Sequence, residues 1–239
     1  MIDAHLLKLK ARDTLSKAEE QAIREAIGEV REVPADRTII RAGEELSVSA
    51  LLIEGILCRY KDLRDGGRQI SELHVAGDFA DLHGFTLKRL DHNVMALTRC
   101  RIALVPHDRL TRITAEHPHL ARLWWFTTNM DAAIHREWVL SLGRRSALSR
   151  LAHLFCELNV RLGVVGLADE GGYALDLTQV DLAECLGLTS VHVNRVLREL
   201  RERGLVAFRG GRVTILDRAA LERVAEFDPS YLYVERRPR

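Results

Sequence analysis

The stretch that most constrains the fold runs from residue 177 to 206 and reads LTQVDLAECLGLTSVHVNRVLRELRERGLV. Thr178 and Thr189 can each cap the start of a helix through a side-chain oxygen. Gly187 lies between the two expected helices, where a tight turn needs a permissive backbone, and Gly204 can end the second helix in a left-handed conformation. Two short helices joined by so tight a turn predict a helix-turn-helix.

The second of these helices has two distinct faces. Its inward positions are apolar, namely Val193, Val196, Leu197 and Leu200, as a buried helical stripe requires. The segment that follows, LVAFRGGRVTIL, predicts a hairpin with two glycines at its tip, which is the wing of a winged helix. An arginine-rich surface helix in an unrelated helical domain is the alternative, but the caps, the turn glycine and the hairpin together favour a winged helix-turn-helix.

The charge of this region fits contact with nucleic acid. Six arginines and two glutamates lie between residues 191 and 212, although the whole chain of 239 residues carries a net charge of only +1. A basic edge of this kind suits phosphate binding. The residues expected to contact DNA are Thr189, Ser190, Val191, His192, Asn194, Arg195, Arg198, Arg209 and Arg212.

The N-terminal half has a different pattern. Ser16 and Glu19 form a capping box in a helical segment that reaches to about residue 30. From Val33 to Pro106, short apolar runs alternate with glycine turns, and Asp65-Gly66-Gly67 marks a hairpin. Many short strands with regular turns predict a small antiparallel barrel or roll.

A long helical stretch begins at Pro118. Leu123, Met130, Ile134 and Trp138 recur along it at heptad-like spacing, which predicts a seam between two copies of the chain. Part of this stripe could instead pack on the roll of its own chain. The expected domains are a sensor roll with its N-terminal helix (1–116), a dimerisation helix (117–143) and a winged helix-turn-helix domain (144–239).

Composition excludes several other classes of protein. No apolar run approaches the length of a membrane span, and the charged N-terminus is unlike a signal peptide. The four cysteines are scattered, so a reduced, cytoplasmic setting is expected. None of the G-x-S-x-G, H-E-x-x-H or P-loop motifs occurs, and we therefore expect no enzyme, no cofactor and no metal.

Beyond the first helix, the chain resembles the Crp/Fnr family of bacterial transcription regulators, most specifically in L-A-x-x-L-G-L-T and V-N-R-V-L-R-E-L. The resemblance implies an α+β fold: an antiparallel β-roll of the cyclic-nucleotide-binding type, a long dimerisation helix and a C-terminal winged helix-turn-helix. It also implies a homodimer that reads inverted-repeat promoter sites, with RNA polymerase as a further partner. The alternative is a cyclic-nucleotide-binding-like module that acts on a protein partner.

The resemblance leaves the effector open. Family members that bind cyclic AMP hold its phosphate with a Gly-Glu-Leu segment and an Arg-Ser pair, and the corresponding positions here hold other residues. Asp81, His83, Arg89 and His92 fall near those positions and are the expected effector-pocket residues. The iron–sulfur members need cysteines near the N-terminus, and none precedes Cys58. A haem-bearing carbon-monoxide sensor in the family uses a histidine close to the place of His83, but the companion cysteine is missing here. Thiol sensing at Cys58 or Cys100 and an unknown small molecule remain alternatives.

Overall fold

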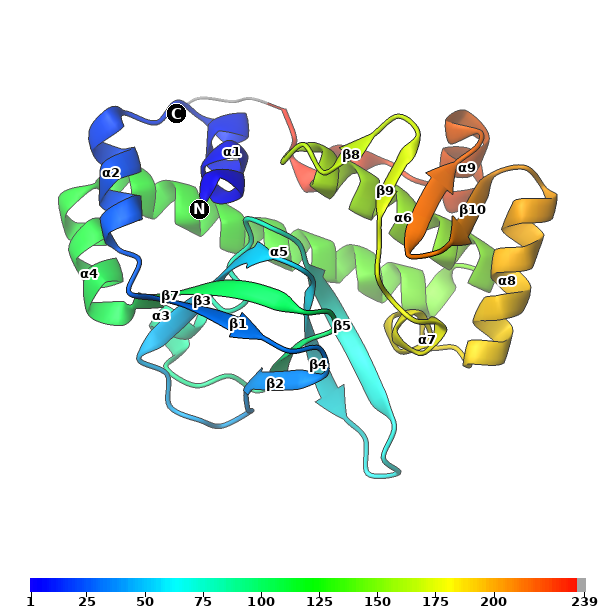
Figure 1. The fold of residues 1–239 in the computed structure, drawn as a ribbon, viewed down its shortest axis with the longest axis horizontal. Helices are drawn as coiled ribbons and strands as arrows, with labels where there is room; N and C mark the ends of the chain where they lie inside the picture. The colour runs from blue at the N-terminus through cyan, green and yellow to red at the C-terminus, as the bar shows by residue number, and fades with distance from the viewer. Residues whose placement is uncertain (236–239) are drawn as a thin grey trace.

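The computed structural model describes residues 1–235, and a roll of two antiparallel sheets forms its N-terminal half (Figure 1). One sheet has the strand order β1-β7-β3 and the other β2-β6-β4-β5. Apolar side chains of both sheets, among them Leu52, Leu57 and Ile102, meet in one buried cluster. The strands are β1 (Glu29–Val33), β2 (Arg37–Ile40), β3 (Val48–Glu54), β4 (Leu57–Asp62), β5 (Arg68–His74), β6 (Asn93–Ala96) and β7 (Cys100–Pro106).

Helices close one end of the roll. They are α1 (Asp3–Arg12), α2 (Lys17–Glu25) and α4 (His107–Glu116), and a short α3 (Gly84–Leu87) lies between β5 and β6. The predicted capping box is confirmed, because the Ser16 side chain accepts from the Glu19 N–H and the Glu19 carboxylate accepts from the Ser16 N–H. The predicted N-terminal helix is, however, two helices separated by the loop around Asp13.

The long helix α5 (Pro118–Arg144) crosses the whole molecule (Figure 1). Proline is tolerated at its first position because that N–H would have no partner inside the helix. The helix passes through Gly143 without a break, and the next helix begins after the capping residue Ser146. The turn between the long helix and the C-terminal part of the chain is therefore at Arg145 and Ser146.

The predicted dimer seam requires a correction. Leu123, Ile134 and Trp138 are all buried within the protomer, and Met130 packs against the same core. Ile134, which is 1% exposed, lies in a cluster with Leu151 and Phe155 of the following helix. The heptad spacing is real, but this face of α5 already covers the roll and the C-terminal part of its own chain.

The C-terminal part is organised around α6 (Ala147–Gly163), which is buried along most of its length. A four-stranded antiparallel sheet of order β10-β11-β9-β8 packs beside it. Its elements are β8 (Ala168–Asp169), β9 (Gly172–Ala174), α7 (Gln179–Leu186), α8 (Ser190–Glu202), β10 (Val206–Arg209), β11 (Arg212–Ile215), α9 (Arg218–Ala225) and the 3₁₀ turn η1 (Pro229–Leu232). The predicted fold class is confirmed. None of the helices in residues 1–235 combines the length and apolarity of a membrane span.

Candidate nucleic-acid interface

The helices α7 and α8 are positioned by the residues that the sequence singled out. The Thr178 side chain accepts from the Asp181 N–H in a complete capping box at the start of α7. Gly187 ends that helix with φ of +60° and ψ of +41°, a left-handed conformation that carries little strain only for glycine. The Thr189 side chain then accepts from the His192 N–H at 3.2 Å and starts α8.

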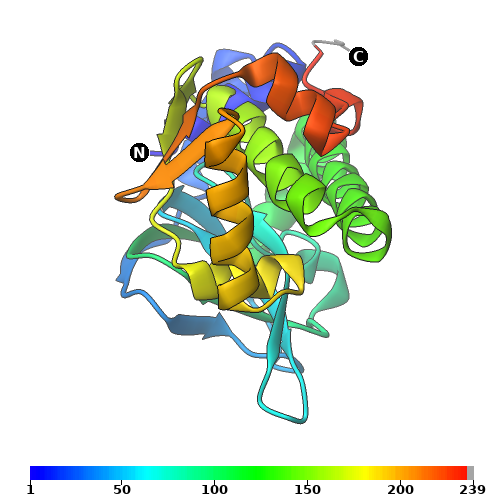
Figure 2. The same ribbon diagram turned by 90° about the vertical axis from the view of Figure 1, so that its right-hand side faces the viewer.

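The two faces of α8 are as predicted. Val193, Val196 and Leu200 are buried against the domain core, and Leu197 packs beside them. The opposite face points to solvent at the end of the molecule, as Figure 2 shows. Val191 is 80% exposed on this face. Its apolar side chain therefore contributes no burial free energy within the protomer. An exposed methyl-bearing side chain suits apolar contact with a thymine methyl group in the major groove.

Arginines surround this exposed face. Arg195 and Arg198 are exposed on α8, while Arg209 and Arg212 face each other at the base of the wing turn. Among the described residues, none of these four arginines has an ion pair with a carboxylate. Their charges are therefore available to an external anion, and an approaching DNA phosphate would not have to displace an internal partner.

The wing turn requires its two glycines. Gly210 and Gly211 have φ of +56° and +69°, the signs that a two-residue turn of a β-hairpin demands. A Cβ at Gly211 would also lie 2.0 Å from a carboxylate oxygen of Asp176. The turn thus places the exposed Arg209 and Arg212 opposite each other on β10 and β11. Figure 2 shows this hairpin beside α8.

Sequence reasoning missed one residue of this surface. The Asn194 side chain donates to the Gln179 Oε1 at 3.2 Å, so the first residue of α7 orients a predicted base-contacting side chain on α8. The available signal was the position of Gln179 immediately after the cap Thr178. We treat Gln179 as part of the candidate interface.

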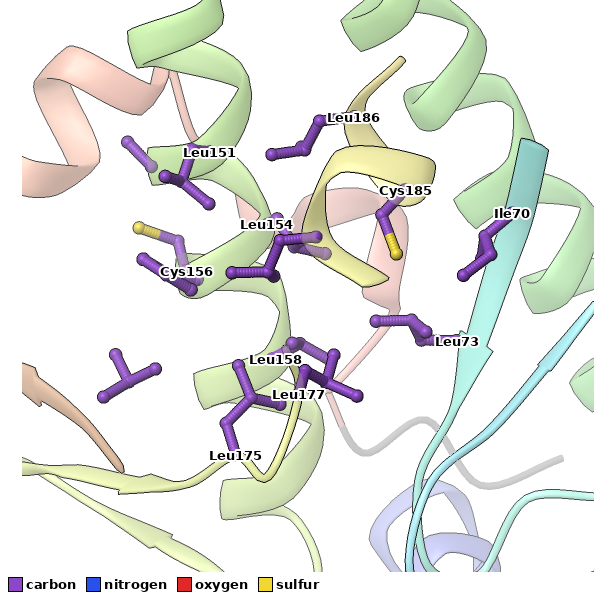
Figure 3. Packing of buried hydrophobic residues seen from close by; sticks show 14 of the residues in the cluster. Ile70, Leu73, Leu151, Leu154, Cys156, Leu158, Leu175, Leu177, Cys185 and Leu186 are labelled. Atoms are coloured by element: carbon purple, nitrogen blue, oxygen red, sulfur yellow. The ribbon is translucent and has the colours of Figure 1, made fainter. Parts of the chain in front are cut away.

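The helix-turn-helix is also anchored to the roll. Arg68 of β5 forms two hydrogen bonds with the Glu184 carboxylate, at 2.7 and 3.2 Å, and the Gln69 amide donates to the Glu184 carbonyl at 2.7 Å. Figure 3 shows the apolar part of this junction, where Ile70 and Leu73 of β5 lie next to Cys185 of α7. The exposed face of α8 takes no part in these contacts.

A second candidate site is an open cleft of about 670 Å³ between the roll and α5. Two of the four predicted effector residues, His83 and His92, line it, with ring centroids 5.4 Å apart. Asp81 is buried beneath and accepts from the Ala50 N–H at 2.6 Å. Arg89 is a correction, because it is exposed outside the cleft and pairs with Glu45.

The buried cationic residue of the cleft is Arg59, which sequence reasoning missed; Lys61, which also lines the cleft, is exposed and pairs with Asp91 at 2.6 Å. Its guanidinium donates to Glu72 at 2.6 Å and to Asp131 of α5 at 3.0 Å. Two carboxylates therefore already occupy the donors that could hold a phosphate. The pattern of β4 alone contains no signal for this role, because Asp131 comes from a distant helix.

Burial decides the charge of the other groups in the cleft. It lowers the pKa of His83 to about 3, with a further contribution from the nearby Arg59 charge, and it also lowers the pKa of His92 and His135. Burial raises the pKa of Asp81 to about 7. At neutral pH the imidazoles are uncharged, so they offer hydrogen bonds to a ligand but no positive charge.

The described residues do not fit an iron–sulfur cluster or another metal centre. All four cysteines are buried, with Cys100 in the roll core and Cys156 and Cys185 in the core of the DNA-binding unit. Burial raises the pKa of Cys156 to about 12, so that thiol stays protonated. No group of three or more potential ligands is assembled anywhere in residues 1–235.

Comparison with known proteins agrees with this architecture. Residues 30–117 match the cyclic nucleotide-binding domain, and residues 149–224 match the Crp-like helix-turn-helix domain. The transcriptional activator protein FnrL of Cereibacter sphaeroides is 30% identical over 204 residues, which cover 83% of this chain and 81% of FnrL. The fumarate and nitrate reduction regulatory protein of Escherichia coli is 25% identical over 215 residues, covering 89% and 84% of the two chains.

The fold is also shared with solved structures. FixK2 from Bradyrhizobium japonicum superposes with a TM-score of 0.72 at 25% sequence identity, covering 82% of this chain and 96% of FixK2. The match extends through the roll, the long helix and the winged helix-turn-helix together. The chain therefore belongs to the Crp/Fnr family of DNA-binding transcription regulators, which are not enzymes.

Proposed function

We propose that the chain acts in the cytoplasm as a homodimer that binds inverted-repeat DNA through α8 and the wing. The observation that carries this proposal is the exposed surface of α8 and the wing, where two arginines on each element have no ion pair with a carboxylate of the described residues. The proposed functional units follow the predicted division, with a sensor roll to residue 116, a dimerisation helix over 117–143 and a DNA-binding unit over 144–239.

The proposed dimer interface is the face of α5 opposite to the predicted seam. Trp125 and Val139 are each 70% exposed, and Ala132 lies between them at heptad spacing. Large apolar side chains so exposed on a long helix mark an interaction surface. The exposed positions that complete this face are Arg122, Asn129, Arg136 and Leu140. Two parallel α5 helices would pair here through an isologous contact.

This pairing supports a symmetric reader. In a parallel pair, the two-fold axis runs along the two α5 helices. In each protomer α8 lies near the C-terminal end of α5 (Figure 1), so both recognition helices would reach the same side of the dimer. Two recognition helices on one side match two half-sites about one helical turn apart.

The test is selection of bound sequences from random DNA with the full-length protein, followed by affinity measurements. The wild type should select an inverted repeat. Arg195→Ala should weaken binding by about 1–3 kcal/mol per half-site and relax preference at one base pair, because arginine can make two hydrogen bonds to guanine. Selection of no inverted repeat would contradict the symmetric-reader proposal.

Arg209→Ala is the matched control. Arg209 lies at the wing, where we expect contact with the sugar–phosphate backbone only. Its loss should weaken all sequences alike and lower the salt dependence by about one unit per phosphate contact. An unchanged sequence preference and full affinity for Arg195→Ala would show that Arg195 is only a surface charge.

We further propose that an effector, if one acts, binds in the cleft between the roll and α5, and that it is not cyclic AMP. The occupied Arg59 and the uncharged imidazoles support this. RNA polymerase is the proposed partner on DNA, since the related FnrL is named a transcriptional activator.

A further inference from the structure

We propose that the C-terminal strap, residues 226–235, is a latch that holds the DNA-binding unit in its DNA-competent position against the sensor. This inference rests on the proposed function. The matched family domains end at residue 224 and begin at residue 30, so both the strap and helix α1 lie outside them. These two additional segments meet across the junction between the domains.

The first half of the strap is fixed to the DNA-binding unit. Tyr231 stacks on His153 of α6, with ring centroids 5.9 Å apart, and its hydroxyl donates to the Glu157 carboxylate at 2.9 Å. The Phe227 ring meets both His153 and Tyr231 in edge contacts, with centroid distances of 5.2 and 6.2 Å. This half therefore moves with α6.

The second half of the strap reaches the sensor part of the chain. The Tyr233 ring meets Phe126, near the start of α5, in an edge contact at 6.1 Å. Arg12 of α1 lies over the same Phe126 ring at 4.4 Å and donates to the Glu235 carbonyl at 3.3 Å. The strap thus connects α6 of the DNA-binding unit to α1 and the first half of α5.

A buried ionic network continues the same connection. Arg161 of α6 donates to Glu157, to the Leu73 carbonyl of the roll and to the Asp78 carboxylate at 3.1 Å. Asp78 also pairs with Lys8 of α1. The hydroxyl of Tyr231 is therefore linked through two carboxylates and Arg161 to the N-terminal helix, with every charge paired.

The outer part of the latch is loosely packed. A pocket of about 70 Å³, partly open to solvent, lies between α1, α5 and the strap, and its lining includes Phe79, Met130 and Val234. Tyr233 and Val234 are 48% and 43% exposed, so the outer strap depends on a few contacts such as the Tyr233–Phe126 pair. A single substitution there can release it without opening the core.

In the latched position, both α8 helices of the proposed dimer are exposed and available to DNA. The exposed face of α8 is unobstructed by any described residue of its own chain, and pairing along α5 brings both copies to one side. If release of the strap lets the DNA-binding unit sample other positions, the apparent Kd rises in inverse proportion to the fraction that remains latched.

The experiment compares Tyr233→Ala with Tyr233→Phe in the full-length protein. Binding to the selected inverted repeat is measured by fluorescence anisotropy, and hydrogen exchange is followed at residues 73–78 and in α1. Loss of one aromatic contact weakens the latch about three- to tenfold, so Tyr233→Ala should raise Kd measurably but by no more than about tenfold, and it should speed exchange at the junction. Tyr233→Phe keeps the ring and should match the wild type.

Tyr231→Phe is a second variant that keeps the stacked ring and removes only the hydroxyl bond to Glu157. It should raise Kd and exchange in the same direction. An unchanged or lower Kd in Tyr233→Ala, or a raised Kd without faster exchange, would overturn the latch. Arg195→Ala should raise Kd with no change in exchange at the junction. A wild type that selects no inverted repeat would instead refute the proposed function.

Discussion

Substitution by aspartate should have different effects on the two faces of α5. On the exposed face it should disrupt the dimer, and on the buried face it should prevent folding. Val139 is 70% exposed on the proposed dimer face, whereas Ile134 is 1% exposed in the protomer core. Val139→Asp should therefore give folded monomers. Ile134→Asp should prevent folding, because it places an unpaired carboxylate in a core that also contains Trp138 and Leu151.

The magnitude for Val139→Asp follows from burial and charge. Pairing would remove two valines from water, a contribution of about 3 kcal/mol that the variant loses. Two carboxylates roughly 9 Å apart across the axis add repulsion of about 2 kcal/mol at an effective dielectric constant of 20. A total of about 5 kcal/mol weakens dimerisation by between three and four orders of magnitude.

For Ile134→Asp, the lost burial of about 2–3 kcal/mol and the penalty for an unpaired buried charge approach the whole stability of an ordinary domain. Sedimentation equilibrium over a concentration series measures the loss of dimerisation in Val139→Asp. Near-ultraviolet circular dichroism with thermal unfolding measures the loss of folding in Ile134→Asp. Val191→Asp is the matched control, since Val191 is 80% exposed on α8 and its loss should leave the dimer intact. A dimeric Val139→Asp together with a folded, monomeric Ile134→Asp would refute this assignment of the faces.

Two further outcomes are expected. Cyclic AMP should show no micromolar binding by calorimetry and no effect on DNA affinity, since Arg59 is already engaged by Glu72 and Asp131; micromolar binding coupled to changed DNA affinity would contradict this. His119 hydrogen-bonds to Glu19, which raises its pKa, so its stabilising effect should be complete below pH of about 6.5 and disappear as pH rises through the raised pKa. The difference in Tm between wild type and His119→Gln should therefore shrink from pH 6 to pH 9, and a constant difference would show that the pairing does not involve the charged imidazole.

Local signals explain why the winged helix-turn-helix could be predicted from the sequence. Thr178, Gly187 and Thr189 each act through neighbours only a few residues away, and the structure shows the caps and the left-handed glycine that their chemistry requires. The hairpin at Gly66 was predictable for the same reason, because Leu63 and Gly67 pair across one turn. Such interactions depend on spacing along the chain, which a sequence displays directly.

The faces of α5 could not be assigned in this way. Its heptad pattern places apolar residues on two stripes, one through Ile134 and one through Trp125 and Val139. Periodicity identifies a stripe that is buried against something, but it does not say whether the covering surface belongs to the same chain. The contacts that decide this, between α5, α6 and the roll, join residues far apart in sequence.

The effector cleft also depends on contacts between residues far apart in the sequence, which the sequence pattern does not reveal. For this reason, the missing cyclic-nucleotide residues do not by themselves define a ligand. Arg59 lies in β4 and Asp131 lies 72 positions later on α5, yet their ion pair sets the charge of the cleft. Because that ion pair joins the roll to the proposed dimerisation helix, a ligand that competes for the Arg59 guanidinium would also loosen a contact between roll and helix. Arg59 would therefore both select the ligand and, through its ion pair with Asp131, transmit ligand binding to α5.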